Sequence, residues 1–154
     1  MEMRLVGDEA MYETILVPTD GSDISIHAAA EAIDLADESG TVHVLAVVEK
    51  LPMYTQSGKG AKLAEKDDTE IREYLSGVTE RVEEMATESG LGCTTAVTEG
   101  VPYREILSAA EDVGADAIVM GKRGHGAAAG DILGSTTERV AKRASSTVVI
   151  VPES

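Results

Sequence analysis

The chain has 154 residues, of which 43% are hydrophobic and 27% charged, a composition typical of one globular domain rather than a disordered segment. Asp and Glu number 28 against 13 Lys and Arg, so the formal net charge is −15. This acid excess argues against nucleic-acid binding and against docking on an anionic membrane, because both need a positively charged face.

Features that would place the chain in or across a membrane are missing from the sequence. No apolar run approaches the about 20 residues that span a bilayer, and residues 1–10 lack the apolar stretch of a signal peptide. The single cysteine, Cys93, cannot form an internal disulfide. We therefore expect a cytoplasmic protein with an N-terminal tail over 1–11 and one domain over 12–152.

The acidity has two interpretations. An acidic surface can simply keep a protein soluble. It is also typical of a host with a salt-rich cytoplasm, such as a halophilic archaeon, where the repulsion between acidic groups is screened.

The first half of the chain predicts two strands and two helices. The continuous apolar run 14–18 indicates a strand covered on both faces. A helical pattern follows it and is expected to end at Gly40. A second strand is predicted over 42–48. Residues 49–62 lose all periodicity and are expected to form a mobile surface loop before a long helix that ends at Gly90.

The second half continues the alternation of strands and helices. The expected elements are a strand over 92–98, a helix that opens at Pro102, a strand over 117–120, a helix from about Thr136 and a strand over 147–151. Strands that alternate with helices predict an α/β fold with an open, doubly wound parallel sheet. Such sheets bind ligands beyond the carboxyl ends of their strands.

A glycine-rich segment lies at one of these carboxyl ends, between Gly121 and Ser135. It holds five glycines, together with Lys122, Arg123 and His125, and it leads into a helix. Glycine lets backbone N–H groups approach a ligand closely, and a helix N-terminus attracts anions. The segment therefore predicts a phosphate-binding site.

Other interpretations of this segment remain open. It can be a flexible loop in which Ser135 and Glu138 form a capping box. A Walker-type phosphate loop is absent, and the spacing after Gly124 does not fit a dinucleotide fingerprint. The sequence also shows no metal-ligand spacing and no nucleophile elbow.

The spacing Gly121-x2-Gly124-x9-Gly134-Ser135 resembles the ATP-binding signature of the universal stress protein family. The first strand with its Pro-Thr-Asp turn and the strands near 117–121 and 147–152 are also similar to that family. The resemblance covers residues 12–152. It implies a flavodoxin-like sheet with strand order 3-2-1-4-5, and a site for ATP, with Mg²⁺ as its companion ion.

The resemblance also implies individual roles. The residues that it places around the nucleotide are Pro18, Thr19, Asp20, Val47, Met120, Gly121, Gly124, His125, Gly134, Ser135 and Thr136. Among them, the residues near 18–20 and Val47 would face the adenosine, and the glycine-rich segment would bind the phosphates. The family commonly forms homodimers through its last strand, here Thr147 to Val151.

Three functions follow from these observations. The leading one is an ATP-binding stress or signalling protein with little or slow hydrolysis, since no general base is evident. The second is a nucleotide-free interaction module of the same family. The third is an ATP pyrophosphatase or adenylating enzyme, whose loop the turn Thr19–Asp23 matches poorly. A protein partner is expected, but the sequence does not name it.

Overall fold

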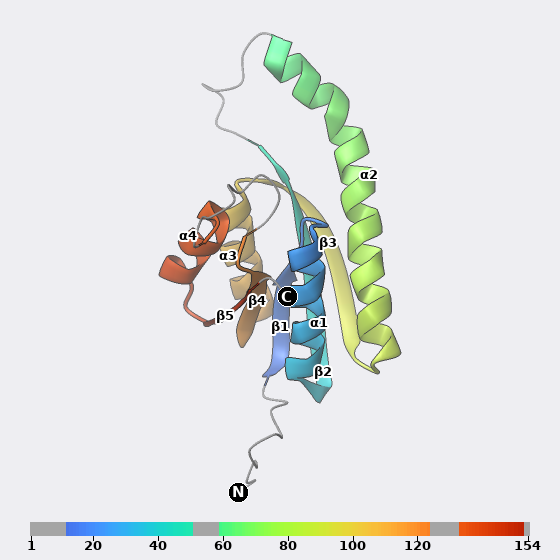
Figure 1. Cartoon of the computed structure of the whole chain (residues 1–154), viewed down its shortest axis with the longest axis vertical. Helices are drawn as coiled ribbons and strands as arrows, with labels where there is room; N and C mark the ends of the chain where they lie inside the picture. Colours follow the sequence, from blue (N-terminus) through green and yellow to red (C-terminus); the bar gives the residue numbers. More distant parts are fainter. Residues whose placement is uncertain (1–11, 51–58, 124–132, 153–154) are drawn as a thin grey trace, which may run out of the picture.

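Five parallel strands form one sheet in the order β3-β2-β1-β4-β5 (Figure 1). The computed structural model describes residues 12–50, 59–123 and 133–152, with the backbone alone described over 59–67. The strands are β1 Tyr12–Pro18, β2 Ala36–Glu49, β3 Gly92–Gly100, β4 Ala117–Gly121 and β5 Thr147–Val151. The helices are α1 Asp23–Leu35, α2 Lys59–Glu88, α3 Pro102–Val113 and α4 Ser135–Arg143. The predicted doubly wound sheet and its strand order are confirmed.

Helices cover both faces of the sheet. On one face, α1 and α2 pack against inward-facing residues of β1 and β2, including Ile15 and Val42. On the other face, α3 and α4 pack against Leu16, Leu45 and Ile118. Figure 1 shows the two helix pairs on opposite sides of the strands. Residues 15–17 of β1 and 117–120 of β4 are buried on both faces, and both runs are apolar without interruption, as the pattern predicted.

Polar contacts fix where the central strands begin. The Asp116 carboxylate, just before β4, accepts hydrogen bonds from the backbone N–H groups of Glu13 and Thr14 at 3.2 and 3.0 Å. The Asp116 N–H in turn donates to the Thr14 carbonyl. These bonds hold β1 and β4 in register, so that Leu16 lies beside Ile118.

The long helix begins earlier than its sequence pattern suggested. α2 starts at Lys59, inside the loop expected over 49–62, and β2 extends to Glu49. Residues 51–58, the remainder of that expected loop, lie outside the described residues. Within the part of the chain that the structure describes, no helix is long and apolar enough to cross a bilayer.

Glycine ends α2 as expected. Gly90 has a φ of 83°, and the N–H groups of Gly90 and Leu91 donate to the carbonyls of Thr87 and Ala86. This is the Schellman arrangement, which needs a residue in the left-handed region and favours glycine there.

The expected end of the first helix at Gly40 is wrong. α1 ends at Leu35, and Gly40 lies within β2. A Cβ atom at Gly40 would lie 2.8 Å from the Asp37 carbonyl and 3.0 Å from the Glu13 carbonyl. Glycine is therefore required at this position because the backbone of β2 itself and the neighbouring β1 both crowd it, and not because a helix ends there.

A pair of glycine substitutions tests this assignment. Gly40→Ala should lower the free energy of unfolding by about 1–3 kcal/mol, since its methyl group would press on backbone atoms. Gly77→Ala is the matched control, because nothing lies within 4 Å of its added Cβ in the middle of α2. There alanine should raise stability by up to about 1 kcal/mol. Urea unfolding of both variants in molar salt measures the difference, and a neutral Gly40→Ala would contradict the account.

Candidate functional site

The turn after β1 is fixed by its own polar side chains. The backbone N–H of Thr19 donates to the Leu45 carbonyl at 2.8 Å, and its buried hydroxyl lies 2.9 Å from the Ser25 hydroxyl. Asp20 Oδ1 accepts hydrogen bonds from the backbone and hydroxyl of Ser22 at 3.0 and 2.6 Å. Ser22 then caps α1 by accepting from the Ser25 N–H. The sequence Thr-Asp-Gly-Ser thus builds a rigid turn at the carboxyl edge of the sheet.

The second structural part of the site is the junction between β4 and α4. The Lys122 N–H donates to the Val151 carbonyl of β5 at 2.8 Å, and the Lys122 carbonyl accepts from the Gly134 N–H at 3.0 Å. Gly121 is buried against Ile24 of α1, where a Cβ atom would lie 3.1 Å from the Ile24 side chain. The two described ends of the glycine-rich segment are therefore tied together at the end of β4.

α4 starts at this junction without a side-chain cap. The N-cap residue is Gly134, and no side chain in the described ranges 12–50, 68–123 and 133–152 accepts a hydrogen bond from the first turn. The alternative of a capping box between Ser135 and Glu138 is therefore wrong: Ser135 is already helical, and Glu138 instead pairs with Lys142 at 2.8 Å. An uncapped first turn leaves backbone N–H groups and the positive end of the helix dipole available to an anion.

The sheet places most of the predicted residues at this same edge. Leu16 lies beside Ile118 and Pro18 beside Leu45. Met120 and Val47 follow Ile118 and Leu45 by two residues each, so both lie near the carboxyl ends of their strands. Both pack on the face that α3 and α4 cover. Gly121 ends β4, and Gly134, Ser135 and Thr136 begin α4. Gly124 and His125 lie outside the described residues.

Thr137 is a residue of the site that the sequence did not single out. It is buried, and its hydroxyl donates to the Gly121 carbonyl at 2.9 Å. This bond holds the first turn of α4 against the end of β4. The signal available in the sequence was the run Ser-Thr-Thr after Gly134. The resemblance assigned roles to Ser135 and Thr136 but not to Thr137.

A cluster of cations lies between α3 and α4. The guanidinium carbons of Arg104, Arg139 and Arg143 are 5.6, 5.4 and 5.2 Å from the centre of the Tyr103 ring. The Arg104 side chain also donates to the Tyr103 hydroxyl at 3.1 Å, which lowers the pKa of Tyr103. These cation–π contacts join the two helices on this face of the sheet.

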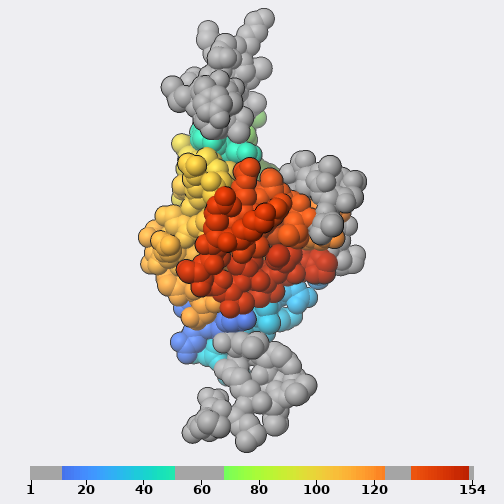
Figure 2. All heavy atoms as spheres, turned by 90° about the vertical axis from the view of Figure 1, so that its left-hand side faces the viewer, coloured from blue at the N-terminus to red at the C-terminus, as the bar shows by residue number. Residues whose placement is uncertain are grey.

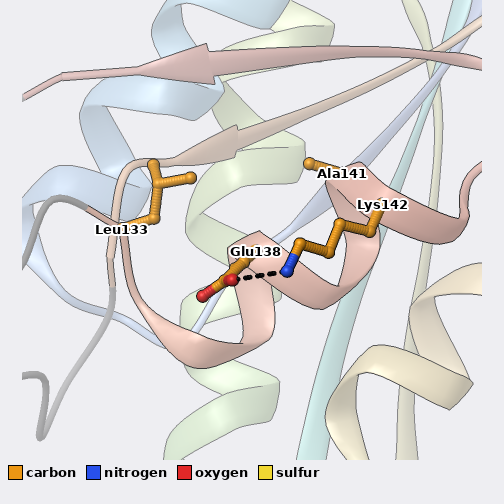
Figure 3. A pocket seen from close by; sticks show the side chains of 4 residues that line it. All are labelled: Leu133, Glu138, Ala141 and Lys142. Carbon is orange, nitrogen blue, oxygen red and sulfur yellow. Dashed lines mark hydrogen bonds and ion pairs between the residues drawn. The ribbon is translucent and has the colours of Figure 1, made fainter.

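A shallow hollow lies beside α4 and is lined by Leu133, Glu138, Ala141 and Lys142 (Figure 3). The Lys142 ammonium holds the pKa of Glu138 below its ordinary value through their hydrogen bond. None of these four lining residues belongs to the set that the sequence predicted for nucleotide binding. The described residues also contain no group of three or more His, Cys, Asp or Glu side chains that could hold a metal ion.

His43 and Cys93 lie away from this edge, toward the start of β3. His43 Nδ1 is 2.6 Å from the Thr94 hydroxyl across the strand pair, and burial lowers the pKa of His43. Burial, with a contribution from Glu83, raises the pKa of Cys93 to about 11. The thiol is therefore protonated near neutral pH, as is typical of a structural rather than a reactive cysteine.

The bond between Thr137 and Gly121 can be tested by substitution. Thr137→Val keeps the shape of the side chain but leaves the Gly121 carbonyl without this donor. We expect the free energy of unfolding to fall by about 1–3 kcal/mol. Thr137→Ser, which retains the hydroxyl, should recover most of that loss. Chemical denaturation of the two variants measures this, and a Thr137→Val protein as stable as the wild type would refute the role.

Known proteins are similar to this chain in both sequence and fold. The universal stress protein MJ0531 of Methanocaldococcus jannaschii is 38% identical over 144 residues, covering 93% of this chain and 84% of its own. The solved structure of MJ0577 covers 94% of this chain and 98% of its own at 26% identity, with a TM-score of 0.82. A universal stress protein solved in complex with cAMP is 26% identical over 93% of this chain and 98% of its own, with a TM-score of 0.66. The model of the Universal stress protein family matches residues 11–152, and the chain belongs to this family.

Proposed function

We propose that this protein binds ATP with Mg²⁺ at the carboxyl edge of the sheet and acts as a nucleotide-regulated stress or signalling protein. The observation that carries the proposal is the uncapped N-terminus of α4, held at the end of β4 by the bond between Lys122 and Gly134. A first helical turn with open N–H groups beside a buried strand end is well suited to phosphate oxygens.

The proposed division of roles follows the resemblance residue by residue. The turn of Pro18, Thr19 and Asp20 would lie against the adenosine, with Val47 beside the base. Met120 and Gly121 would form the floor beneath the nucleotide. The residues assigned to the phosphates and ribose are Gly124, His125, Gly134, Ser135 and Thr136. The rigid turn at Asp20 supports this division, because its bonds with Ser22 fix the backbone before any ligand arrives.

Two further observations support a nucleotide ligand. A relative of this fold has been solved in complex with cAMP, which is also a nucleotide with an adenine base. Lys122 and Arg123 bring positive charge to the described end of β4 in a chain whose net charge is −15. Local cations of this kind offset the repulsion that a phosphate would otherwise meet.

We infer that hydrolysis is slow or absent. Asp20 Oδ1 already accepts two hydrogen bonds from Ser22, so this oxygen is occupied within the turn rather than aimed at an attacking water. Bound ATP would then act through the stability or the surface of the protein rather than through turnover.

Thermal unfolding tests ATP binding. A ligand at 100 times its Kd stabilises the native state by about 2.7 kcal/mol, so saturating ATP with Mg²⁺ should raise Tm by about 5 °C or more. The double variant Gly124→Val, Gly134→Val should lose this rise. Gly77→Ala, far from the site in sequence and in an open part of α2, should keep it. An undiminished rise in the double variant would refute the assignment, and no rise in the wild type would favour the nucleotide-free module.

We also propose that two copies associate through β5. In the described sheet β5 pairs with β4 and stands last in the strand order. Its residues Thr147 to Val151 are mostly β-branched and apolar, and Figure 2 shows β5 and α4 on the face turned toward the viewer. An apolar edge strand of this kind favours pairing with another strand.

The acid excess leads to a proposal about salt. Since acids outnumber bases by 28 to 13, at least 15 carboxylates cannot form one-to-one ion pairs. In molar salt the Debye length falls to about 3 Å, which removes most of their mutual repulsion. We propose that the protein is adapted to high salt, as in a halophilic archaeon.

Melting in salt tests this adaptation. Tm should rise between dilute buffer and 2 M KCl, because screening relieves repulsion that is stronger in the compact state than in the unfolded chain. The same titration with sucrose at matched viscosity controls for solvent effects other than charge screening. A Tm that does not change with KCl would contradict the adaptation and leave solubility as the explanation of the acidity.

A further inference from the structure

Thr98, near the end of β3, carries a buried hydroxyl with no hydrogen-bond partner among the described residues. A buried polar atom without a partner is unfavourable, and each such atom calls for an explanation. Valine has the same shape, favours strands equally and would avoid this cost. The hydroxyl of Thr98 is therefore not explained by the packing of the ligand-free protein.

The position of Thr98 links it to the candidate site. In the parallel pairing of β2 with β3, Thr98 lies directly beside Val47. Neighbouring residues of a strand point to opposite faces. Val97 packs with Leu75 of α2 on one face, so Thr98 points to the other. Val47 packs on that same face, beside which we place the base of the nucleotide.

Fraying does not explain the unpaired hydroxyl, because the end of β3 is held on several sides. The Lys50 N–H donates to the Gly100 carbonyl at 2.8 Å. The Arg72 side chain donates to the Val97 carbonyl at 3.3 Å and pairs with Glu99 at 2.5 Å. Thr98 therefore sits in a fixed backbone, as a group that recognises a ligand must.

The hydroxyl can reach a ligand by a simple rotation. Its oxygen is covered, but Thr98 as a whole is only partly buried. Rotation about the Cα–Cβ bond moves Oγ1 between staggered positions, and no hydrogen bond holds it in the present one. A hydroxyl both donates and accepts, so it suits the edge of a purine base, where donors and acceptors alternate.

We propose that Thr98 is a base-contacting residue whose hydroxyl hydrogen-bonds the polar edge of the nucleotide's base beside Val47. This inference rests on the proposed function, and it adds a contact from β3 to the contacts from β1, β2, β4 and α4. It accounts for the buried, unpartnered hydroxyl as a group that is satisfied only when the ligand is bound.

The test compares three proteins by calorimetric titration with ATP and Mg²⁺. Thr98→Val should weaken ATP binding about tenfold, the loss expected for one hydrogen bond, while its ligand-free Tm stays the same or rises. Thr98→Ser, which keeps the hydroxyl and lacks the methyl group, should bind ATP within about twofold of the wild type. Together these results would establish the hydroxyl as the contact.

Other results would overturn the proposal. Unchanged ATP affinity in Thr98→Val would show that the hydroxyl makes no contact with the ligand. Equal losses in the valine and serine variants would assign the effect to packing of the methyl group. A wild-type protein that binds no ATP would instead refute the proposed function itself, so the two failures are distinguishable.

Discussion

The backbone of Lys122 is the point on which the candidate site depends. Its N–H donates to the Val151 carbonyl of β5, and its carbonyl accepts from the Gly134 N–H at the start of α4. One residue therefore joins the end of the sheet to the start of α4. The Thr137 hydroxyl adds a second bond from α4 to the neighbouring Gly121 carbonyl. Together these bonds fix the first turn of α4, and none of the described side chains caps its N–H groups. Rigid placement of open backbone donors is what an anion site requires.

This arrangement would allow a strongly acidic chain to receive the acidic ligand that we propose. Backbone N–H groups and the helix dipole provide positive potential without adding to the side-chain charge. Such groups act over the length of one helical turn and are little affected by the many carboxylates elsewhere on a surface in salt. The turn at Thr19 and Asp20 is held by similar short-range bonds within its own residues. Both parts of the site therefore depend on local hydrogen bonds rather than on the charge of the whole protein.

Much of the fold could be predicted because its signals are local. Continuous apolar runs indicated the buried strands, and β5 was predicted with its observed bounds. The Glu-Ser-Gly sequence that ends at Gly90 and the one that ends at Gly40 look alike, yet only Gly90 has a positive φ. Gly40 is required by the carbonyls of Asp37 and Glu13, and Glu13 is its neighbour only in the folded chain. Thr137 and Thr98 escaped prediction for the same reason, because Thr137 meets Gly121 and Thr98 lies beside Val47 only in the folded chain.

The most direct test of the account is to titrate ¹⁵N-labelled protein with ATP and Mg²⁺ in high salt and follow the backbone amide resonances. The account predicts that the largest shifts fall on Gly134, Ser135 and Thr136 in the first turn of α4, on Gly121, and on Val47 beside the proposed base. A Thr137→Val protein should show smaller shifts at the α4 residues, since their placement is less secure. Absence of shifts at millimolar ATP, or shifts confined to α2, would contradict a nucleotide site at the carboxyl edge of the sheet.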